Sequence, residues 1–461
     1  MGPKAAYRDG NVLRWLFAYA ASLIGDGVYF LALGWAAARA AGPAEAGVVM
    51  AAGAVPRALL MLGGGVVADR FGPRLVVVSS DAVRCAVVLA VAAAVWTSTP
   101  GLWALTLVAL LFGAVDALFM PAVGALPPRI AGPGQLVRVQ GMRNLVERVG
   151  HTAGPPLAGL AMGVAGPGAA FAVAGALFAV SLVLLLAVRI TPVPDLAPGG
   201  GSAGPAAVGP AAVGGGAVGG GAVGGGAGGG GAVAGGAGGG CSADGTAGPP
   251  DRGTASAESP WQQLRRGLAY IRRHPVIGPL VVSGALSQLG ISAPLTLGLI
   301  LLAGERHWGP SGVGWIVGAF GVGAASSALV LTLVPRVPKA GAVQNATLIV
   351  GSAGIGALAL TPSLPAAVVL ALVTGQVCGV CGGLAVALIQ SATDARYLGR
   401  VSSVMAFTAV GMAPMTYPVF GFAAGLFGTV PVFVAGGLLS MAGAIVGTSA
   451  PAVRRAELAF G

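Results

Sequence analysis

Long apolar runs separated by short polar loops dominate the sequence. A helix needs about 20 mainly apolar residues to span a bilayer, and twelve runs of the chain reach that length. The predicted spans cover residues 12–38, 45–68, 74–96, 101–124, 139–164, 167–189, 276–302, 311–334, 341–361, 364–390, 400–427 and 430–450. The pattern therefore predicts an all-α polytopic membrane protein with twelve transmembrane helices. Only 8% of the residues are charged, against roughly 25% in soluble domains, which agrees with this interpretation.

Residues 190–260 interrupt the apolar pattern. The centre of this segment is Gly with some Ala and Val, and such a composition cannot bury a core. We therefore expect an N-terminal six-helix half over 1–189, a flexible Gly-rich cytoplasmic linker over 190–260, and a C-terminal six-helix half over 276–461.

A short amphipathic helix is predicted over 261–275, between the linker and the C-terminal half. Ser259, Pro260 and Gln262 have the residue types of an N-cap, an N1 position and a capping partner. Four apolar residues share one face: Trp261, Leu264, Leu268 and Ile271. The polar side carries four arginines: Arg265, Arg266, Arg272 and Arg273. We expect this basic helix to lie on the inner leaflet.

The cationic residues of the loops lie almost entirely on one predicted side of the membrane. Only Arg39 and Arg306 fall on the other side. The positive-inside rule then places both termini and the linker in the cytoplasm of a multi-pass cell-membrane protein. This location also accounts for the formal charge of +11, so we expect a lipid-bilayer environment and no nucleic-acid partner.

Motifs of metal, redox or enzyme chemistry are weak in this chain. Cys378 and Cys381 form a Cys-x-x-Cys, but it lies inside a Gly/Ala-rich span without a nearby His or carboxylate. The sequence has no HExxH motif, no nucleotide loop and no clustered loop carboxylates. One Gly-x-Ser-x-Gly occurs at 200–204, inside the linker. We therefore expect no catalytic residues, no metal, no cofactor and no enzyme activity.

A charged turn between the second and third spans reads GGVVADRFGPR over residues 64–74. Gly72 can adopt φ > 0 at little steric cost, and Pro73 suits the first turn of the next helix. Asp69 lies at the C-terminal end of its own helix, where the macrodipole disfavours an anion. We therefore expect Asp69 to have another partner, either an arginine or the N-terminus of another helix.

The pattern Gly-x-x-Ala-Asp-Arg-x-Gly-x-Arg in this turn resembles the loop 2–3 motif of the major facilitator superfamily of transporters. Pro73 departs from it, because a second basic residue is usual there. The resemblance implies two six-helix halves with a substrate site between them, and a cytoplasmic gate in which Asp69 contacts the eleventh helix near residues 399–403. The candidate gate residues are Gly65, Asp69, Arg70, Gly72, Arg74, Asp81, Arg84 and Asp116.

The fifth span has a regular pattern of small residues, Gly-x8-Gly-x3-Gly-Pro-x3-Gly. Its members are Gly141, Gly150, Gly154, Pro155 and Gly159. Small residues let helices pack closely, and an internal proline bends a helix. The spacing resembles motif C of facilitator antiporters, which implies export. Ordinary packing in a Gly-rich protein is the alternative.

Five further segments resemble a bacterial exporter branch that includes enterobactin exporters and macrolide efflux proteins. They are residues 25–26, 80–84, 112–122, 267–275 and 398–403. The resemblance implies drug:proton antiport, and with it protons as a partner.

Charged side chains at membrane depth are costly and usually functional, and all of those predicted here lie in the N-terminal half. They are Asp26, Arg57, Asp81, Arg84, Asp116, Glu147 and Arg148. Counting 1.5 Å per residue places Asp26 and Arg57 near the midplane. The other five fall nearer the cytoplasmic side, where we expect them to pair among themselves as a structural network.

Asp26 and Arg57 are the candidate proton-coupling residues. Burial favours a protonated Asp26, whereas a nearby Arg57 favours the carboxylate. This competition permits a switch between a proton and an ion pair. A permanent Asp26–Arg57 pair that only orders the N-terminal half is the alternative.

The sequence as a whole favours a secondary active transporter. We expect proton-coupled efflux of a small amphiphilic molecule, such as a drug, a siderophore or a secondary metabolite, by a monomeric protein. An importer or uniporter of a small nutrient is the first alternative. A membrane-integral enzyme or a non-transporting scaffold is the alternative of another class.

Overall fold

Long helices make up almost all of the computed structural model, which describes residues 6–98, 101–132, 134–189, 260–334, 336–394 and 397–459. Ten helices in these ranges are long and apolar enough to cross a membrane. One of them, α6 (Leu136–Leu186), contains two spans, because Ala165 and Gly166 leave the helical region of φ/ψ. With α2 (Pro43–Phe71), which has 29 residues, the twelve predicted spans are accounted for, and the all-α membrane fold is confirmed.

The helices form two groups along the chain. The N-terminal group consists of η1 (Ala6–Arg8), α1 (Gly10–Ala41), α2, α3 (Pro73–Thr97), α4 (Leu102–Gly124), α5 (Pro127–Ile130) and α6. The C-terminal group consists of α7 (Pro260–Arg273), α8 (Ile277–Ala293), η2 (Pro294–Gly298), α9 (Leu299–Glu305), α10 (Gly309–Leu333), α11 (Ala340–Leu360), α12 (Leu364–Ala392), α13 (Leu398–Gly411), α14 (Ala413–Phe427), α15 (Thr429–Ser449) and α16 (Pro451–Arg455). A two-residue strand β1 (Arg336–Val337) pairs antiparallel with β2 (Leu458–Ala459).

Glycine and proline set several helix boundaries. Gly72 has φ 84° and Pro73 opens α3, as the sequence predicts. The same arrangement joins α1 to α2, where Gly42 has φ 102° and Pro43 comes next. Because glycine adopts positive φ without a Cβ penalty, two long helices can be joined there by a single residue.

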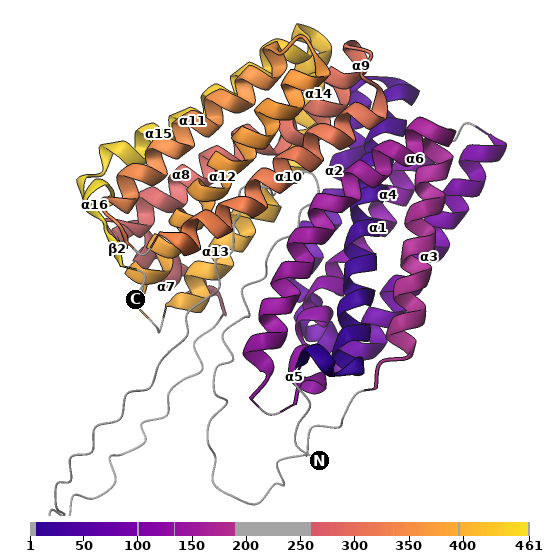
Figure 1. Ribbon diagram of the computed structural model, residues 1–461, viewed down its shortest axis with the longest axis horizontal. Coiled ribbons are helices and arrows are strands. Elements are labelled where there is room, and N and C mark those ends of the chain that lie inside the picture. Colours follow the sequence, from indigo (N-terminus) through magenta and orange to yellow (C-terminus); the bar gives the residue numbers. More distant parts are fainter. Residues whose placement is uncertain are drawn as a thin grey trace, which may run out of the picture.

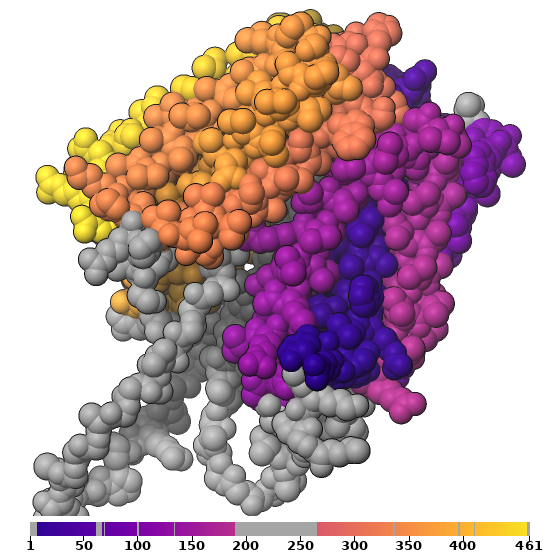
Figure 2. Space-filling view, in the orientation of Figure 1, coloured from indigo at the N-terminus to yellow at the C-terminus, as the bar shows by residue number. Residues whose placement is uncertain are grey.

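The two groups form separate bundles that meet near one end and diverge toward the end where α5 and α7 lie (Figure 1). The space-filling view shows the same contact between the halves, away from that end (Figure 2). The contact is made by α6 with α10 and by α2 with α14. At the second of these contacts, Gly421 of α14 faces Pro43 and Gly47 of α2.

The short helix α7 combines an exposed basic face with a buried apolar anchor. Arg265, Arg266, Arg272 and Arg273 are exposed. Ile271 is buried in a cluster with Ile277 and Leu280 of α8, so it packs against the protein instead of the leaflet. The predicted linker, apart from Pro260, lies outside the described residues, as do the side chains of Trp261 and Leu264.

Candidate functional site

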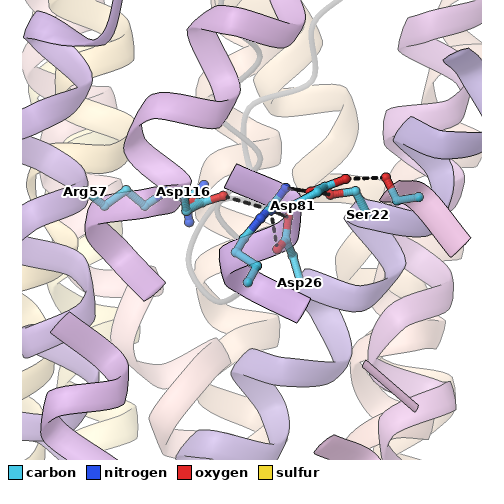
Figure 3. Close-up of polar contacts among 7 residues, drawn as sticks. Ser22, Asp26, Arg57, Asp81 and Asp116 are labelled. Atoms are coloured by element: carbon cyan, nitrogen blue, oxygen red, sulfur yellow. Dashed lines mark hydrogen bonds and ion pairs between the residues drawn. The ribbon is translucent and has the colours of Figure 1, made fainter. Parts of the chain in front are cut away.

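Arg84 of α3 is the centre of a cluster of charged side chains buried in the N-terminal bundle. Its Nη1 atom lies 2.9 Å from Oδ1 of Asp26 on α1 and 3.5 Å from Oδ1 of Asp116 on α4. Its Nη2 atom forms an ion pair with Asp81, three residues earlier on α3. Figure 3 shows Asp26, Asp81 and Asp116 pointing toward this common centre. One guanidinium thus joins three carboxylates from three helices.

Two aromatic rings flank the Arg84 guanidinium. Its Cζ atom lies 3.8 Å from the centre of the Phe119 ring and 4.9 Å from that of Phe178. A guanidinium over an aromatic face gains cation–π stabilisation, which is larger where water is excluded. Because the Arg84 side chain is fully buried, these rings help to replace the water that it loses.

Arg57 of α2 extends the cluster on the side of Asp116. Its Nε atom lies 3.0 Å from Oδ2 of Asp116, so Asp116 bridges the two arginines. The guanidinium also lies 5.8 Å from the centre of the Phe30 ring on α1. The cluster therefore ties α1, α2, α3 and α4 together through charge contacts.

Two serines complete the environment of Asp81. Ser22 of α1 donates to Oδ1 of Asp81 at 3.3 Å and accepts from Nη2 of Arg84 at 2.9 Å. Ser181 of α6 donates to Oδ2 of the same carboxylate. Asp81 therefore has three hydrogen-bonding partners and no exposed side-chain surface, as expected of a buried polar group with a structural role.

Counting residues along the helices predicts two separate groups of charged side chains, and the observed ion pairs show that this separation is wrong. The prediction places Asp26 and Arg57 at the midplane and the second group nearer the cytoplasmic side. In the structure Arg84 pairs with Asp26 and Asp116 pairs with Arg57, so part of the second group forms one cluster with the two midplane candidates. The ion pair between Asp81 and Arg84 could be predicted from the sequence, because the two residues are three positions apart and share a helix face.

Charge in the cluster is unbalanced. Three carboxylates (Asp26, Asp81 and Asp116) face two guanidiniums (Arg57 and Arg84). With every group ionised, the cluster has a net charge of −1. Because an uncompensated charge is costly in a buried site, the cluster is suited to binding a proton or another cation.

Glu147 of α6 belongs to a second cluster, which corrects its expected place in the same network. Its Oε1 atom lies 3.0 Å from Nη2 of Arg143, one turn earlier on α6. Tyr19 of α1 donates a hydrogen bond to the same oxygen at 2.6 Å, and its ring lies beneath the Arg143 guanidinium. This cluster fastens α6 to α1.

The glycine motif of α6 lies at close helix contacts on two sides. Toward α1, a Cβ at Gly154 would lie 2.9 Å from Cα of Gly27, and one at Gly150 would lie 2.8 Å from Cβ of Leu23. These distances are shorter than real Cβ contacts, so side chains at both positions would force α6 away from α1.

Toward α10, a Cβ at Gly159 would lie 2.7 Å from the backbone oxygen of Pro310. The motif helix therefore reaches the C-terminal bundle through Gly159. Gly141 differs from the other three glycines, because a Cβ there would meet nothing within 4 Å.

The candidate gate residues have different surroundings. Arg70 is exposed, and Arg74 donates a hydrogen bond to the backbone oxygen of Leu186 at 3.0 Å. The side chain of Asp69 lies outside the described part, so its predicted contact with the start of α13 stays a prediction. Asp81, Arg84 and Asp116 belong to the buried cluster with Asp26. No group of three His, Cys, Asp or Glu residues in the described ranges is arranged to hold a metal ion.

Two bundles of membrane-length helices that meet near one end, one of them with a buried cluster of charges, have the architecture of a multi-pass membrane transporter. The sequence profile of the Major Facilitator Superfamily matches residues 15–414, and the chain belongs to this family. A search of curated protein sequences gives no match.

Solved structures confirm the fold. The crystal structure of the nucleoside transporter NupG is similar, with a TM-score of 0.65 and 13% identity over 95% of this chain and 98% of that chain. A bacterial homologue of the human lysosomal transporter Spinster, in an inward-facing and unoccupied conformation, gives 0.58 and 13%, over 97% and 96%. The human organic anion transporter MFSD10 gives 0.52 and 15%, over 95% and 98%. At these identities the similarity shows the fold alone.

Proposed function

We propose that this facilitator-family transporter is a proton-coupled exporter of a small amphiphilic molecule. The observation that carries the proposal is the buried cluster in which three carboxylates face two guanidiniums. One proton would neutralise the cluster, and a conformational change that admits water to it would release that proton. A carrier that moves between two such states couples proton flow to substrate flow.

Asp26 is the carboxylate best suited to bind and release the proton. Its side chain is 7% exposed, whereas those of Asp81 and Asp116 are 0% and 2% exposed. Within the described residues, Asp26 accepts hydrogen bonds only from Arg84, whereas Asp81 also accepts from two serines and Asp116 contacts both arginines. Protonating Asp26 would therefore break fewer contacts. Arg57, which pairs with Asp116, would act on Asp26 through its charge.

The proposed membrane orientation and transport direction rest on features of the sequence. The loop cations place both termini in the cytoplasm of a cell-membrane protein, so the diverging end of the bundles would face inward. The glycine motif of α6, which resembles that of antiporters, reaches the contact between the halves through Gly159. Its resemblance to antiporters, together with the segments similar to enterobactin and macrolide exporters, supports efflux of a drug, siderophore or secondary metabolite.

Asp26→Asn is the decisive variant, because asparagine resembles the protonated carboxyl. In proteoliposomes with an imposed pH gradient, we expect uphill transport to be lost while substrate binding and exchange persist. Asp81→Asn is the matched control: it removes the same charge from a fully enclosed site, so reduced thermal stability is expected there. Uphill transport by Asp26→Asn would overturn the assignment.

Import or facilitated diffusion of a small nutrient is the second candidate. The similar structures include a nucleoside transporter and an organic anion transporter, and this fold by itself does not select a substrate or a direction. A substrate screen in vesicles with the pH gradient imposed in each direction separates the candidates. Export by antiport predicts that substrate accumulates on the outer side, from which the protons enter, whereas proton-coupled import predicts accumulation on the inner side.

A further inference from the structure

Three arginines surround a pocket at the end of the N-terminal bundle where α1 and α3 begin and α6 ends. The pocket has a volume of about 610 Å³, and its lining consists of Arg14, Arg74 and Arg189 with Leu186, Ala187 and Val188. All three arginines are exposed, and the lining contains no acidic residue. A concentration of guanidiniums without carboxylates is suited to an anion.

Hydrogen bonds to the backbone fix the wall of this pocket. Asn11 of α1 donates to the backbone oxygen of Arg189 at 2.6 Å and accepts from its N–H at 2.8 Å. Arg74 donates to the backbone oxygen of Leu186 at 3.0 Å. The last residue of α6 is thus attached to α3, and the chain just after α6 is attached to α1. Asp9 is the acidic residue nearest to Arg14 in the sequence. It is the N-cap of α1, and its carboxylate accepts a hydrogen bond from the N–H of Asn11.

Exposed apolar side chains continue from the pocket along the bundle. Phe17 lies one turn beyond Arg14 on α1 and is 64% exposed. On α6, Leu186 borders the pocket and is 56% exposed, and Val183, one turn deeper, is 65% exposed. Residues three apart share a helix face. The surface therefore changes from cationic to apolar in the direction of the bilayer core.

We propose that this pocket binds the phosphate headgroup of an anionic glycerophospholipid, with an acyl chain along Phe17, Val183 and Leu186. Guanidinium groups match phosphate oxygens in planar, bidentate geometry. Basic pockets between transmembrane helices favour anionic headgroups over zwitterionic ones. Free phosphate would use only the arginines, whereas a lipid would also use the apolar surface. The site lies apart from the Asp26 cluster, so the inference does not depend on the transported substrate.

The test is lipid binding to the purified full-length protein in neutral detergent, followed by native mass spectrometry and thermal unfolding. The probes are phosphatidylglycerol, phosphatidylcholine with the same acyl chains, and inorganic phosphate. We expect phosphatidylglycerol alone to be retained and to raise the unfolding temperature, and this effect to weaken at high salt.

Arg14→Gln/Arg189→Gln removes two arginines and leaves Arg74, a candidate gate residue, unchanged. Phosphatidylglycerol should bind it about twenty-five-fold more weakly, at roughly a fivefold loss for each basic residue. Arg454→Gln/Arg455→Gln is the matched control, because it removes two exposed arginines of α16 and should retain the lipid. Arg14→Lys/Arg189→Lys, which keeps the charge, should bind with intermediate affinity.

Equal affinity of the Arg14/Arg189 and Arg454/Arg455 variants for phosphatidylglycerol would overturn the proposal. So would equal retention of phosphatidylcholine by the unaltered protein, which needs no variant to fold. Stabilisation by inorganic phosphate equal to that by phosphatidylglycerol would also refute it, because the apolar surface would then contribute nothing.

Discussion

The guanidinium of Arg84 donates to the carboxylate of Asp26 at 2.9 Å, across 58 positions of sequence. This contact joins α3 to α1 in the interior of the N-terminal bundle. It gives the candidate proton site a fixed partner that is itself enclosed by Phe119 and Phe178. Protonation of Asp26 would therefore change the charge balance around a group that cannot move far.

Arg84→Gln should strongly destabilise the N-terminal bundle. It would leave three buried carboxylates with Arg57 as their only cation within the cluster, and breaking a buried ion pair costs about 3–5 kcal/mol. Arg84→Lys should cost less, because it keeps the charge but loses the planar fork. Thermal unfolding in detergent measures both, with the exposed Arg138→Gln as the control. An unchanged midpoint for Arg84→Gln would contradict the role of Arg84 as the centre of the cluster.

Arg57 and Asp116 should prove energetically coupled. Their side chains lie 3.0 Å apart and are both buried, and directly contacting residues show interaction energies of about 0.5–3 kcal/mol. We expect Arg57→Gln/Asp116→Asn to be more stable than the sum of the single variants predicts. A double-mutant cycle on unfolding free energies gives this value. Additive effects would show that the observed pair contributes nothing to stability.

Gly159→Ala should separate the two halves at their contact. The added Cβ would lie 2.7 Å from the oxygen of Pro310, so α6 and α10 must move apart. Spin labels at the exposed positions Val164 and Trp315 should then report a longer distance, and we expect transport to fall.

Gly141→Ala is the matched control for this variant, because its Cβ would meet nothing within 4 Å. Alanine also has a helix propensity better than glycine by about 1 kcal/mol, so this variant should be neutral or slightly more stable. Identical label distances in the two alanine variants would argue against a close-packing role for Gly159.

The linker should be accessible only from the cytoplasm. A protease site placed between residues 200 and 240 tests this orientation, which follows from the loop cations. Cleavage is expected in inside-out vesicles and not in intact cells. A second site beside Arg306, on the opposite side, should give the reverse result. Cleavage of the linker from outside intact cells would show that the predicted topology is wrong.

The sequence alone determined the number of spans and most of their ends. Hydrophobic length is a local property, so twelve runs of about 20 residues predict twelve helices wherever those helices pack. Gly72 and Pro73 marked a boundary in the same way, because their backbone preferences do not depend on distant residues. Family membership also followed from local sequence, through the motif around Asp69.

Only the tertiary structure decided which charges meet. The sequence placed Asp26, Arg57, Arg84 and Asp116 on four helices, but the tilt and offset of each helix set the depth of its side chains. Counting 1.5 Å per residue ignores both, and it separated Asp26 from Arg84, although they lie 2.9 Å apart. The pocket of Arg14, Arg74 and Arg189 likewise exists only because α6 ends between the starts of α1 and α3. Contacts between distant helices depend on packing geometry, which no local pattern encodes.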